Sequence, residues 1–361
     1  IDMATKMSIP PAVGRGNMPP GFGSFYPDHT KFLMSHGDGV SAPPTNIMLE
    51  YDGNAGTALP NVTVGAAGSE PTMEDWGPDG KSVVYVLPSA TASWDGSGRT
   101  DDDHIFGGSL FSISYNAGTF GAPVSLLASA GENNYYPSYS PDGQLIIFDR
   151  APLVGSASAL TTCAGGFCPN DSFSNPAARV MLMKSAPGST PVDLEAANGS
   201  PAASPLKFSN SWPKWSPFLQ NYKGDKLLWI AFSSTRDYGL RVRNHQPGMF
   251  QCYPSDSYED PGSTHGQKFQ PNCQQPQLWM AAIDVTVAIA PQIAKDPSRV
   301  GFWLPFQDIT THNHTPQWTQ SAGPKPDGGA CVQVGGNCTQ GGTCCTGLVC
   351  QANGTCGALP Q

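Results

Sequence analysis

One segment of the chain combines carboxylates with a histidine at a spacing that could hold a metal ion. Asp95 lies in a Gly/Ser-rich stretch, and Asp101, Asp102 and Asp103 are followed directly by His104. Carboxylate oxygens suit Ca²⁺, whereas an imidazole favours a transition metal. The spacing matches neither an EF-hand nor the Gly-Gly-x-Gly-x-Asp calcium repeat, so the alternative is a solvated acidic loop. We predict a metal site with calcium as the candidate ion and with these ligands: Asp95, Asp101, Asp103 and His104.

A second set of residues could bind a ligand through amides and aromatic rings. The pattern Asn-x-x-Pro-x-aromatic occurs at residues 134–139, 210–215 and 313–318. Aromatic rings with a few well-placed amides are typical of binding sites, and such a set could grip a sugar or a peptide terminus. The alternative is that each Asn forms an Asx-type turn. We predict a binding site formed by Asn134, Tyr135, Asn210, Trp212, Asn313 and His314.

Signatures of catalysis are weak. The chain has no Gly-x-Ser-x-Gly nucleophile elbow and no His-Glu-x-x-His zinc motif. The segment Gly14-Arg15-Gly16 lacks the rest of any phosphate-binding fingerprint. The motifs therefore favour a protein that binds over one that catalyses.

Composition limits the fold and the partners. Only 13% of the 361 residues are charged, against about 25% in a typical soluble domain, and the 41 Gly and 35 Pro disfavour helices. The net charge of −9 offers no basic surface to nucleic acid or to an anionic membrane. The longest apolar runs have the length of a strand, far short of a bilayer span, so we expect no transmembrane segment. The sequence indicates a turn-rich, all-β protein.

Ten cysteines indicate an oxidising compartment, so we expect a secreted, periplasmic or cell-surface protein. Six of them crowd into residues 331–356 with almost no apolar core, and no His lies among them as a zinc ligand. Their spacing, C-x6-C-x5-CC-x4-C-x5-C, resembles the inhibitor cystine knot, or knottin. That resemblance implies the pairs Cys331–Cys345, Cys338–Cys350 and Cys344–Cys356, although the spacing alone leaves other pairings open. The remaining four are expected to pair within their own loops: Cys163–Cys168 and Cys252–Cys273.

The body of the chain contains a degenerate repeat. Each copy begins with one of five aromatic residues, here called the marker aromatics: Phe25, Trp76, Tyr139, Trp215 and Trp318. The clearest copies, residues 76–85 and 139–148, continue with a Pro-Asp-Gly turn and a β-rich run, which is a hairpin signature. Further strand-like runs follow at residues 46–51, 109–114, 124–127, 179–183 and 277–283. The repeat predicts a series of four-stranded units.

These repeats resemble the TolB-like (PD40/WD40-like) propeller family, whose blades carry Pro-x-Trp-Ser-Pro-Asp-Gly before a hydrophobic strand. The resemblance spans roughly residues 20–320 and implies a β-propeller of four-stranded blades. At least four blades are visible, and a complete ring would have five to six. A β-sandwich with coincidental turns is the alternative. We expect a propeller in residues 1–320, a Pro/Gly linker in 321–330 and the cystine-knot module in 331–356.

Long insertions separate the second and third strands of each unit, at residues 36–45, 88–108, 151–178 and 234–276. In a propeller these connections share one face with the links between blades, and six of the seven histidines fall there. The Asn residues of the repeated pattern precede the innermost strands, so they should ring the channel on that face. Function usually lies on elaborated loops of this kind.

The leading prediction is a non-enzymatic recognition or scaffold protein that binds an extracellular polymer or protein through its loop-rich face. The alternative is a propeller-type carbohydrate-active enzyme, a polysaccharide lyase or hydrolase. Propeller lyases use His with Arg, Tyr or a metal, a set that Arg236, Tyr238, His312 and His314 could supply.

Ring closure raises a separate question, because four blades and a fragment make a poor ring. Residues 1–20 offer at most one strand, near Thr5–Ile9. We expect that Ile1 is an internal boundary and that an upstream fragment or a neighbouring subunit completes the propeller. The alternative is a further blade hidden before Trp318, with Phe302–Leu304 as one of its strands.

Overall fold

The computed structural model describes most of the repeat-containing body and a small part of the C-terminal segment. The chain divides into two compact units, residues 1–317 and 318–361. The residues described are 22–28, 30–35, 47–52, 59, 62–64, 71–93, 100–153, 155–156, 175, 177–201, 208–218, 220–236, 258–259, 268–269, 276–307, 313, 315–318, 337, 348–350 and 354–358.

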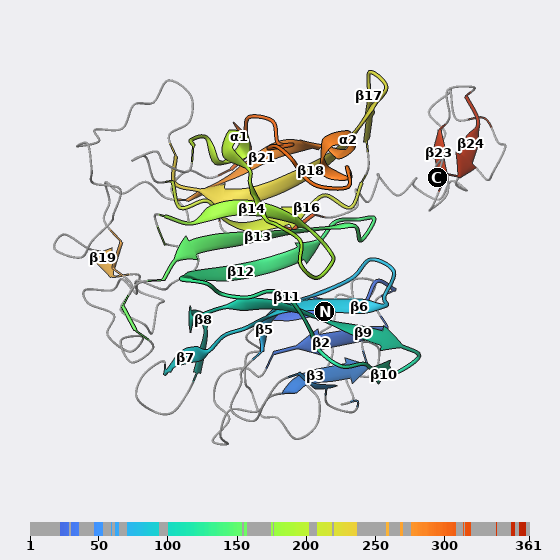
Figure 1. Ribbon diagram of the computed structural model, residues 1–361. Coiled ribbons are helices and arrows are strands. Elements are labelled where there is room, and N and C mark those ends of the chain that lie inside the picture. The colour runs from blue at the N-terminus through green and yellow to red at the C-terminus, as the bar shows by residue number, and fades with distance from the viewer. Residues whose placement is uncertain are drawn as a thin grey trace. The chain divides into compact units, whose positions relative to one another are not determined.

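Four antiparallel sheets follow one another along the first unit (Figure 1). The first sheet has the order β1 (Gly23–Phe25), β2 (Lys31–Met34), β3 (Ile47–Asp52) and β4 (Val62–Thr63). The second contains β5 (Thr72–Trp76), β6 (Ser82–Leu87) and β9 (Ser109–Asn116), with β10 (Thr119–Phe120) and β11 (Val124–Leu127) both paired to β9.

The third and fourth sheets repeat this order. The third is β12 (Glu132–Tyr139), β13 (Leu145–Pro152), β14 (Arg179–Lys184) and β15 (Val192–Asp193). The fourth is β16 (Ser211–Trp215), β18 (Asp225–Ser234), β21 (Gln277–Asp284) and β22 (Phe302–Trp303), with β17 (Gln220–Tyr222) also paired to β18. Each sheet therefore has the strand order of a propeller blade, and the predicted hairpins and strand runs are confirmed.

The long connections contain little further regular structure among the residues described. One hairpin, β7 (Ala90–Ser93) with β8 (Thr100–Phe106), lies between β6 and β9, and another, β19 (Tyr258–Glu259) with β20 (Lys268–Phe269), lies between β18 and β21. Two four-residue helices, α1 (Glu195–Asn198) and α2 (Val285–Ala288), follow β15 and β21. No described helix is long and apolar enough to cross a membrane.

One alternative from the sequence is wrong. Phe302 and Trp303 are not part of a further blade, because they form β22, which pairs with β21 as the outermost strand of the fourth sheet. Trp303 lies opposite Trp279 and packs against the core of that sheet. The long interval before the fifth marker aromatic thus includes the outer strand of the fourth sheet.

The Pro-Asp-Gly turns form as their residue types predict. Asp79 accepts the backbone N–H of Lys81 at 2.9 Å, and Gly80 adopts a φ of 67° that favours glycine. The third sheet repeats this arrangement, because Asp142 accepts the N–H of Gln144 at 3.1 Å. These short turns fix the register of the first two strands.

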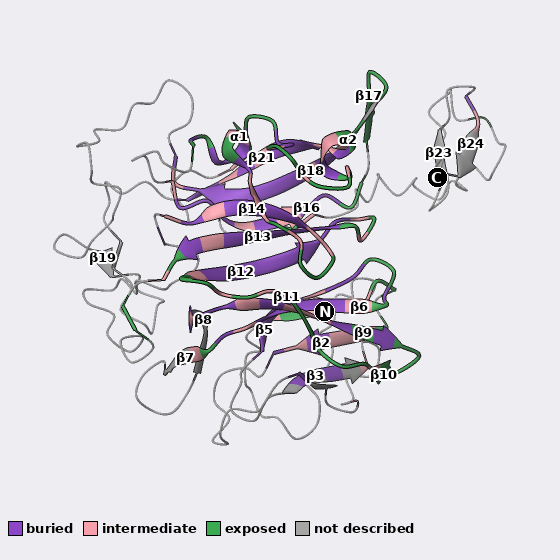
Figure 2. Ribbon diagram, in the orientation of Figure 1, coloured by how far each residue is buried: buried purple, intermediate pink, exposed green. Residues whose placement is uncertain are grey.

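Apolar side chains alternate along the strands and fill the space between neighbouring sheets. Figure 2 shows that most residues of β12 and β13, in the third sheet, are buried. In β13, Leu145 and Ile147 face the fourth sheet, whereas Ile146 and Phe148 face the second. All four are fully buried, and burying a side chain of this size contributes about 1.5 to 3 kcal/mol. A third cluster, around Leu33, joins the first and second sheets. The first unit is therefore held together by sheet-to-sheet packing.

In the second unit, the described residues form a small hairpin. Strands β23 (Leu348–Cys350) and β24 (Cys356–Ala358) pair so that Cys350 lies opposite Cys356, and Asn337 bridges to Thr355. No free cysteine is found among the residues described. The other eight cysteines lie outside the described residues, so the knottin pairing and the two loop disulfides stay predictions.

Candidate functional site

A strained bend recurs three residues before the marker aromatic. The backbone φ is 57° at Met73, 47° at Tyr136, 56° at Trp212 and 50° at Thr315, in a region that residues with side chains rarely adopt. In the second, third and fourth sheets this residue lies where the register between the first two strands shifts, as in a β-bulge. Such strain costs on the order of 1 to 3 kcal/mol per residue. Because a β-bulge changes the direction of a side chain, these three repeats use the same backbone distortion to orient the residue at this position.

Side chains at this position of the first four repeats lie together. The rings of Tyr136 and Trp212 stack with centroids 4.1 Å apart and an angle of 14°. Phe22, which directly precedes β1, lies 5.7 Å from each of them. The Sδ atom of Met73 accepts the backbone N–H of Tyr136 at 3.3 Å. We name these residues the axial cluster, since the first strands of the four sheets converge on it.

The residue directly before the marker aromatic is polar in the first four repeats. Ser24 Oγ accepts the backbone N–H of Trp76 at 3.1 Å, and Asp75 Oδ2 accepts that of Tyr139 at 3.0 Å. Each side chain thus caps the first strand of the following sheet. Lys214 occupies this position in the fourth sheet, and its Nζ lies 3.7 Å from Asp75 Oδ1.

Two buried carboxyl groups lie close to these layers. Asp149 Oδ2 accepts the backbone N–H of Trp212 at 2.8 Å, and Glu74 Oε1 accepts that of Ser35 at 2.6 Å. The Ser211 side chain also interacts with the Asp149 carboxyl, whereas Glu74 Oε2 is buried without a partner from another residue that the structure describes. Burial raises the pKa of Glu74 to about 8 and the pKa of Asp149 well above its usual 3.8. Such perturbed groups mark candidate functional positions.

The Asn of the repeated pattern forms a backbone hydrogen bond to the residue at which each insertion returns to its sheet. The backbone N–H of Asn134 donates to Gly108 O at 3.2 Å, that of Asn210 to Ala178 O at 3.2 Å, and that of Asn313 to Pro276 O at 3.0 Å. Each acceptor directly precedes the third strand of the preceding sheet. The returning ends of three long insertions therefore enter their sheets at equivalent places, whereas the prediction that all insertions share one face stays a prediction. We name these contacts the Asn clips.

The side chains of two clips are themselves buried and paired with arginines. Asn134 Nδ2 donates to Gly108 O at 2.8 Å, and its Oδ1 accepts from Arg150 Nε at 3.1 Å. Asn210 Oδ1 accepts from Arg236 Nη2 at 2.8 Å. The exposed fractions of Asn134 and Asn210 are only 1% and 2%. The predicted ring of ligand-binding amides stays a prediction, but these two amides are occupied by protein partners.

Arg236 lies at the base of the fourth insertion in a closed environment. Its Nη2 also donates to Ala197 O at 2.7 Å, and its guanidinium lies 4.5 Å from the ring centroid of Trp279. Burial, together with the nearby charge of Arg179, lowers the pKa of Arg236 to about 9. A Cβ on Gly199, which has a φ of 74°, would come within 2.8 Å of Arg236 Nη1. The left-handed φ favours glycine there, and any larger residue would also have to displace the Arg236 guanidinium.

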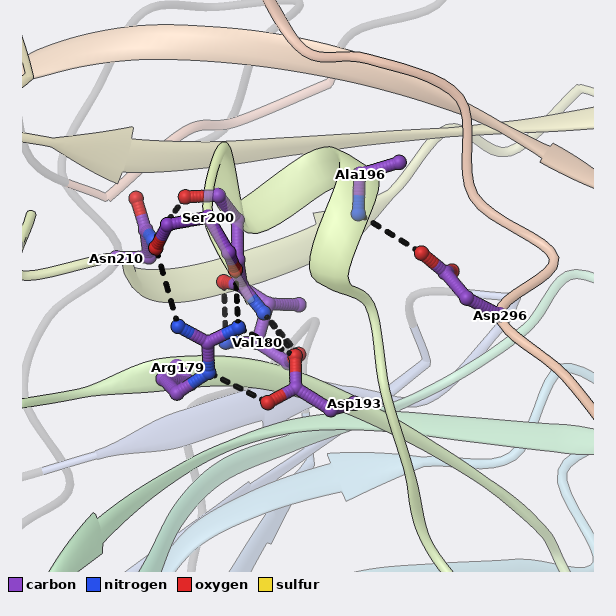
Figure 3. Close-up of polar contacts among 8 residues, drawn as sticks. Arg179, Val180, Asp193, Ala196, Ser200, Asn210 and Asp296 are labelled. Carbon is purple, nitrogen blue, oxygen red and sulfur yellow. Dashed lines mark hydrogen bonds and ion pairs between the residues drawn. The ribbon is translucent and has the colours of Figure 1, made fainter. Parts of the chain in front are cut away.

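Figure 3 shows the polar network between the third and fourth sheets, around the turn that contains α1. Arg179 binds Asp193 through Nε at 2.5 Å and Nη2 at 2.9 Å, and it also donates to Ser200 O. Asn198 exchanges two hydrogen bonds of 2.9 Å with the backbone of Val180. Asn210 Nδ2 donates to Asn198 O at 3.0 Å, which joins the clip to this network. Hydrogen bonds, some of them charge-assisted, thus connect the turn that contains α1 to β14 and to the Asn210 clip.

The other predicted residues fall in different places. Tyr135 is fully buried, and its hydroxyl accepts from Asn133 Nδ2 at 2.5 Å, whereas Trp212 belongs to the axial cluster. Asn313 Nδ2 donates to Gln277 Oε1 at 3.2 Å. His314 lies outside the described residues, as do Tyr238 and His312 of the lyase set.

The predicted metal site is not tested. The backbone of Asp101, Asp103 and His104 forms part of β8, whereas Asp95 lies outside the described residues. Within the described part of the chain, no group of three or more His, Cys, Asp or Glu side chains could hold a metal ion. The calcium assignment stays a prediction.

Sequence reasoning named Trp212 but missed the other members of the axial cluster and the buried Glu74 and Asp149. A signal for the cluster was present, because each repeat carries a large side chain or Thr three residues before its marker aromatic. The bulge that turns this residue toward the axis has no distinctive residue type, because Met, Tyr, Trp and Thr all occupy it.

No protein-family model and no curated protein sequence matches the chain. Among solved structures, it is similar to a candidate TolB protein from Agrobacterium tumefaciens, at 16% identity over 73% of this chain and a TM-score of 0.33. It is also similar to the periplasmic gluconolactonase PpgL of Pseudomonas aeruginosa, at 14% identity over 74% of this chain, with 69% of that protein covered and a TM-score of 0.36. The chain spans about 60% of the length of the TolB protein. Likeness at this level carries no argument about activity.

The strand order and the packing of the sheets themselves define the class. The chain is a mostly β protein of consecutive antiparallel sheets with the order of propeller blades.

Proposed function

We propose that the chain is a non-enzymatic recognition protein that binds an extracellular polymer or protein through its loop-rich face. The single observation that carries the proposal is the set of Asn clips, which hold the ends of three insertions at equivalent places of successive sheets. Loops held by a rigid scaffold are where binding residues concentrate.

The environment of Arg236 supports binding over catalysis. This arginine is the described member of the lyase set, and it is 7% exposed. Its guanidinium is shared between Asn210, Ala197 O and Ser234. A catalytic arginine must contact substrate, whereas the hydrogen bonds of Arg236 go to protein groups beside the start of the fourth insertion. The carbohydrate-active enzyme remains the competing outcome of the experiment below.

The high cysteine content supports a secreted, periplasmic or cell-surface location. The clip at Asn313 and the left-handed Thr315 support a fifth repeat that begins at residue 313, in line with a ring of five to six blades. The linker 321–330 would then connect the propeller to the cystine-knot module.

An array of polysaccharides and extracellular proteins, read for both binding and released products, tests the proposal. We expect saturable binding to at least one polymer or protein without any product. Release of unsaturated or shortened saccharides would instead establish the lyase or hydrolase.

A further inference from the structure

The guanidinium of Arg236 has five N–H donors, and the residues described accept only three of them. Nε donates to Ser234 Oγ at 3.0 Å, and Nη2 donates to Ala197 O at 2.7 Å and to Asn210 Oδ1 at 2.8 Å. Nη1 has no hydrogen-bond acceptor among the residues described. Since Arg236 is only 7% exposed, and buried N–H groups are rarely left without an acceptor, we expect a further acceptor beside Nη1.

The groups that surround this guanidinium are polar or aromatic, but they are neutral. Its three acceptors are a hydroxyl, a backbone carbonyl and a side-chain amide. The ring centroids of Phe208, Phe232 and Trp279 lie 5.6, 5.3 and 4.5 Å from the guanidinium carbon, and cation–π contacts of this kind stabilise the charge only in part. Buried charges in proteins are normally paired with an opposite charge. Arg236 is therefore a buried cation without a counterion among the residues described.

A second arginine adds to the positive charge around Arg236. Burial and the charge of Arg179 together leave the pKa of Arg236 at about 9, so the guanidinium stays protonated at neutral pH. Arg179 has a carboxylate of its own, because its Nε and Nη2 donate to the two oxygens of Asp193 (Figure 3). Two guanidinium groups and one carboxylate leave one positive charge in excess among these three residues.

Two glycines border Nη1, the nitrogen without an acceptor. A Cβ on Gly199, which directly follows α1, would come within 2.8 Å of Nη1. A Cβ on Gly301, which directly precedes β22, would come within 3.4 Å of the same atom. Because neither residue has a side chain, a small acceptor can approach Nη1 where a larger residue would obstruct it. The low exposure of Arg236 excludes a bulky ligand.

We propose that Arg236 binds a small monovalent anion through Nη1, with chloride as the candidate ion. An anion accepts the two remaining N–H groups and also supplies the missing negative charge. A water molecule would accept the N–H groups without balancing the charge, and it is the competing description. Because Arg236 lies at the start of the fourth insertion and binds the Asn210 clip, the anion would stabilise the base of the loop-rich face. The inference does not depend on what that face binds.

Chloride NMR of the full chain tests the proposal, because chloride that exchanges with a protein site broadens the line of the free ion. We expect Arg236→Met to lose most of the broadening that the wild-type chain causes. The matched control Arg299→Met removes a guanidinium that is 64% exposed, and it should leave the broadening unchanged. Gly301→Ala keeps the Arg236 guanidinium but places a methyl group 3.4 Å from Nη1, so it should weaken chloride binding severalfold.

Urea unfolding of the wild-type chain gives a second readout that needs no variant to fold. Chloride replaces gluconate, a bulky anion, at constant ionic strength. Each tenfold rise in chloride above its dissociation constant should then raise the ratio of folded to unfolded chain by up to about tenfold. A urea midpoint that does not depend on chloride would overturn the proposal and leave water as the acceptor. Line broadening in Arg236→Met equal to that of the wild type would also overturn it, because chloride would then bind elsewhere.

Discussion

Replacing Asn210 by alanine would remove the most connected of the Asn clips. The amide donates to Asn198 O at 3.0 Å and accepts from Arg236 Nη2 at 2.8 Å, while its backbone N–H bond to Ala178 O would remain. The residue is 2% exposed, so water cannot easily replace the lost partners. The change therefore leaves one buried carbonyl and one buried guanidinium short of a hydrogen bond.

The expected cost follows from these two contacts. A neutral hydrogen bond contributes about 1 kcal/mol, and one to a charged group about 1.5 to 3 kcal/mol. Their sum predicts that the free energy of unfolding falls by about 3 kcal/mol, a large part of the 5 to 15 kcal/mol typical of a domain. The control Gln220→Ala removes an exposed amide that binds Trp229 Nε1, and it should cost less than about 1 kcal/mol.

Urea unfolding under non-reducing conditions, followed by tryptophan fluorescence, would measure both variants. Hydrogen exchange should also show faster opening near residues 178–180 and 234–236 in Asn210→Ala. A loss of stability no larger than that of Gln220→Ala would refute the reasoning, because the Asn210 side chain would then contribute no more to stability than an exposed amide.

Two other predictions concern stability. Since Glu74 keeps its proton up to about pH 8 in the folded chain and loses it near 4.5 when unfolded, stability should fall as pH rises through this window, by up to about 5 kcal/mol. The variant Glu74→Gln should flatten that part of the pH profile, and a profile identical to that of the wild type would contradict the burial argument. Ala117 and Gly118 form a two-residue hairpin loop with φ values of 46° and 92°, for which Asn-Gly is preferred. Ala117→Asn should therefore raise the urea midpoint, by the equivalent of about 0.5 to 1 kcal/mol, and an unchanged or lower midpoint would count against the turn assignment.

The sheets were predictable because their signals are local. The Pro-Asp-Gly turns and alternating apolar residues specify each hairpin within about ten residues, as at Asp79 and Asp142. The outer strand β22 was not predicted as part of the fourth sheet, and only the alternative of a further blade included it, because a two-residue strand after a long connection has no local signature.

The site was less predictable because its contacts are non-local. The importance of Asn210 was visible in the repeated pattern, but its partner Arg236 lies 26 residues further along the chain, and their pairing depends on the register of β16 with β18. The meeting of Lys214 with Asp75 likewise depends on the convergence of strands from different repeats. The burial that raises the pKa of Glu74 is a property of the folded interior and leaves no trace in residue spacing.

The central claim is that ligands bind at the loop-rich face. The most direct measurement compares the affinity of two variants for a polymer or protein found on the array. One variant replaces residues 157–174 of the third insertion by a short Gly/Ser linker, and the other replaces the β17 hairpin at the opposite end of the fourth sheet. We predict that binding weakens at least tenfold in the first variant and is unchanged in the second. Unchanged binding in the first variant together with loss in the second would contradict the assignment of the binding face.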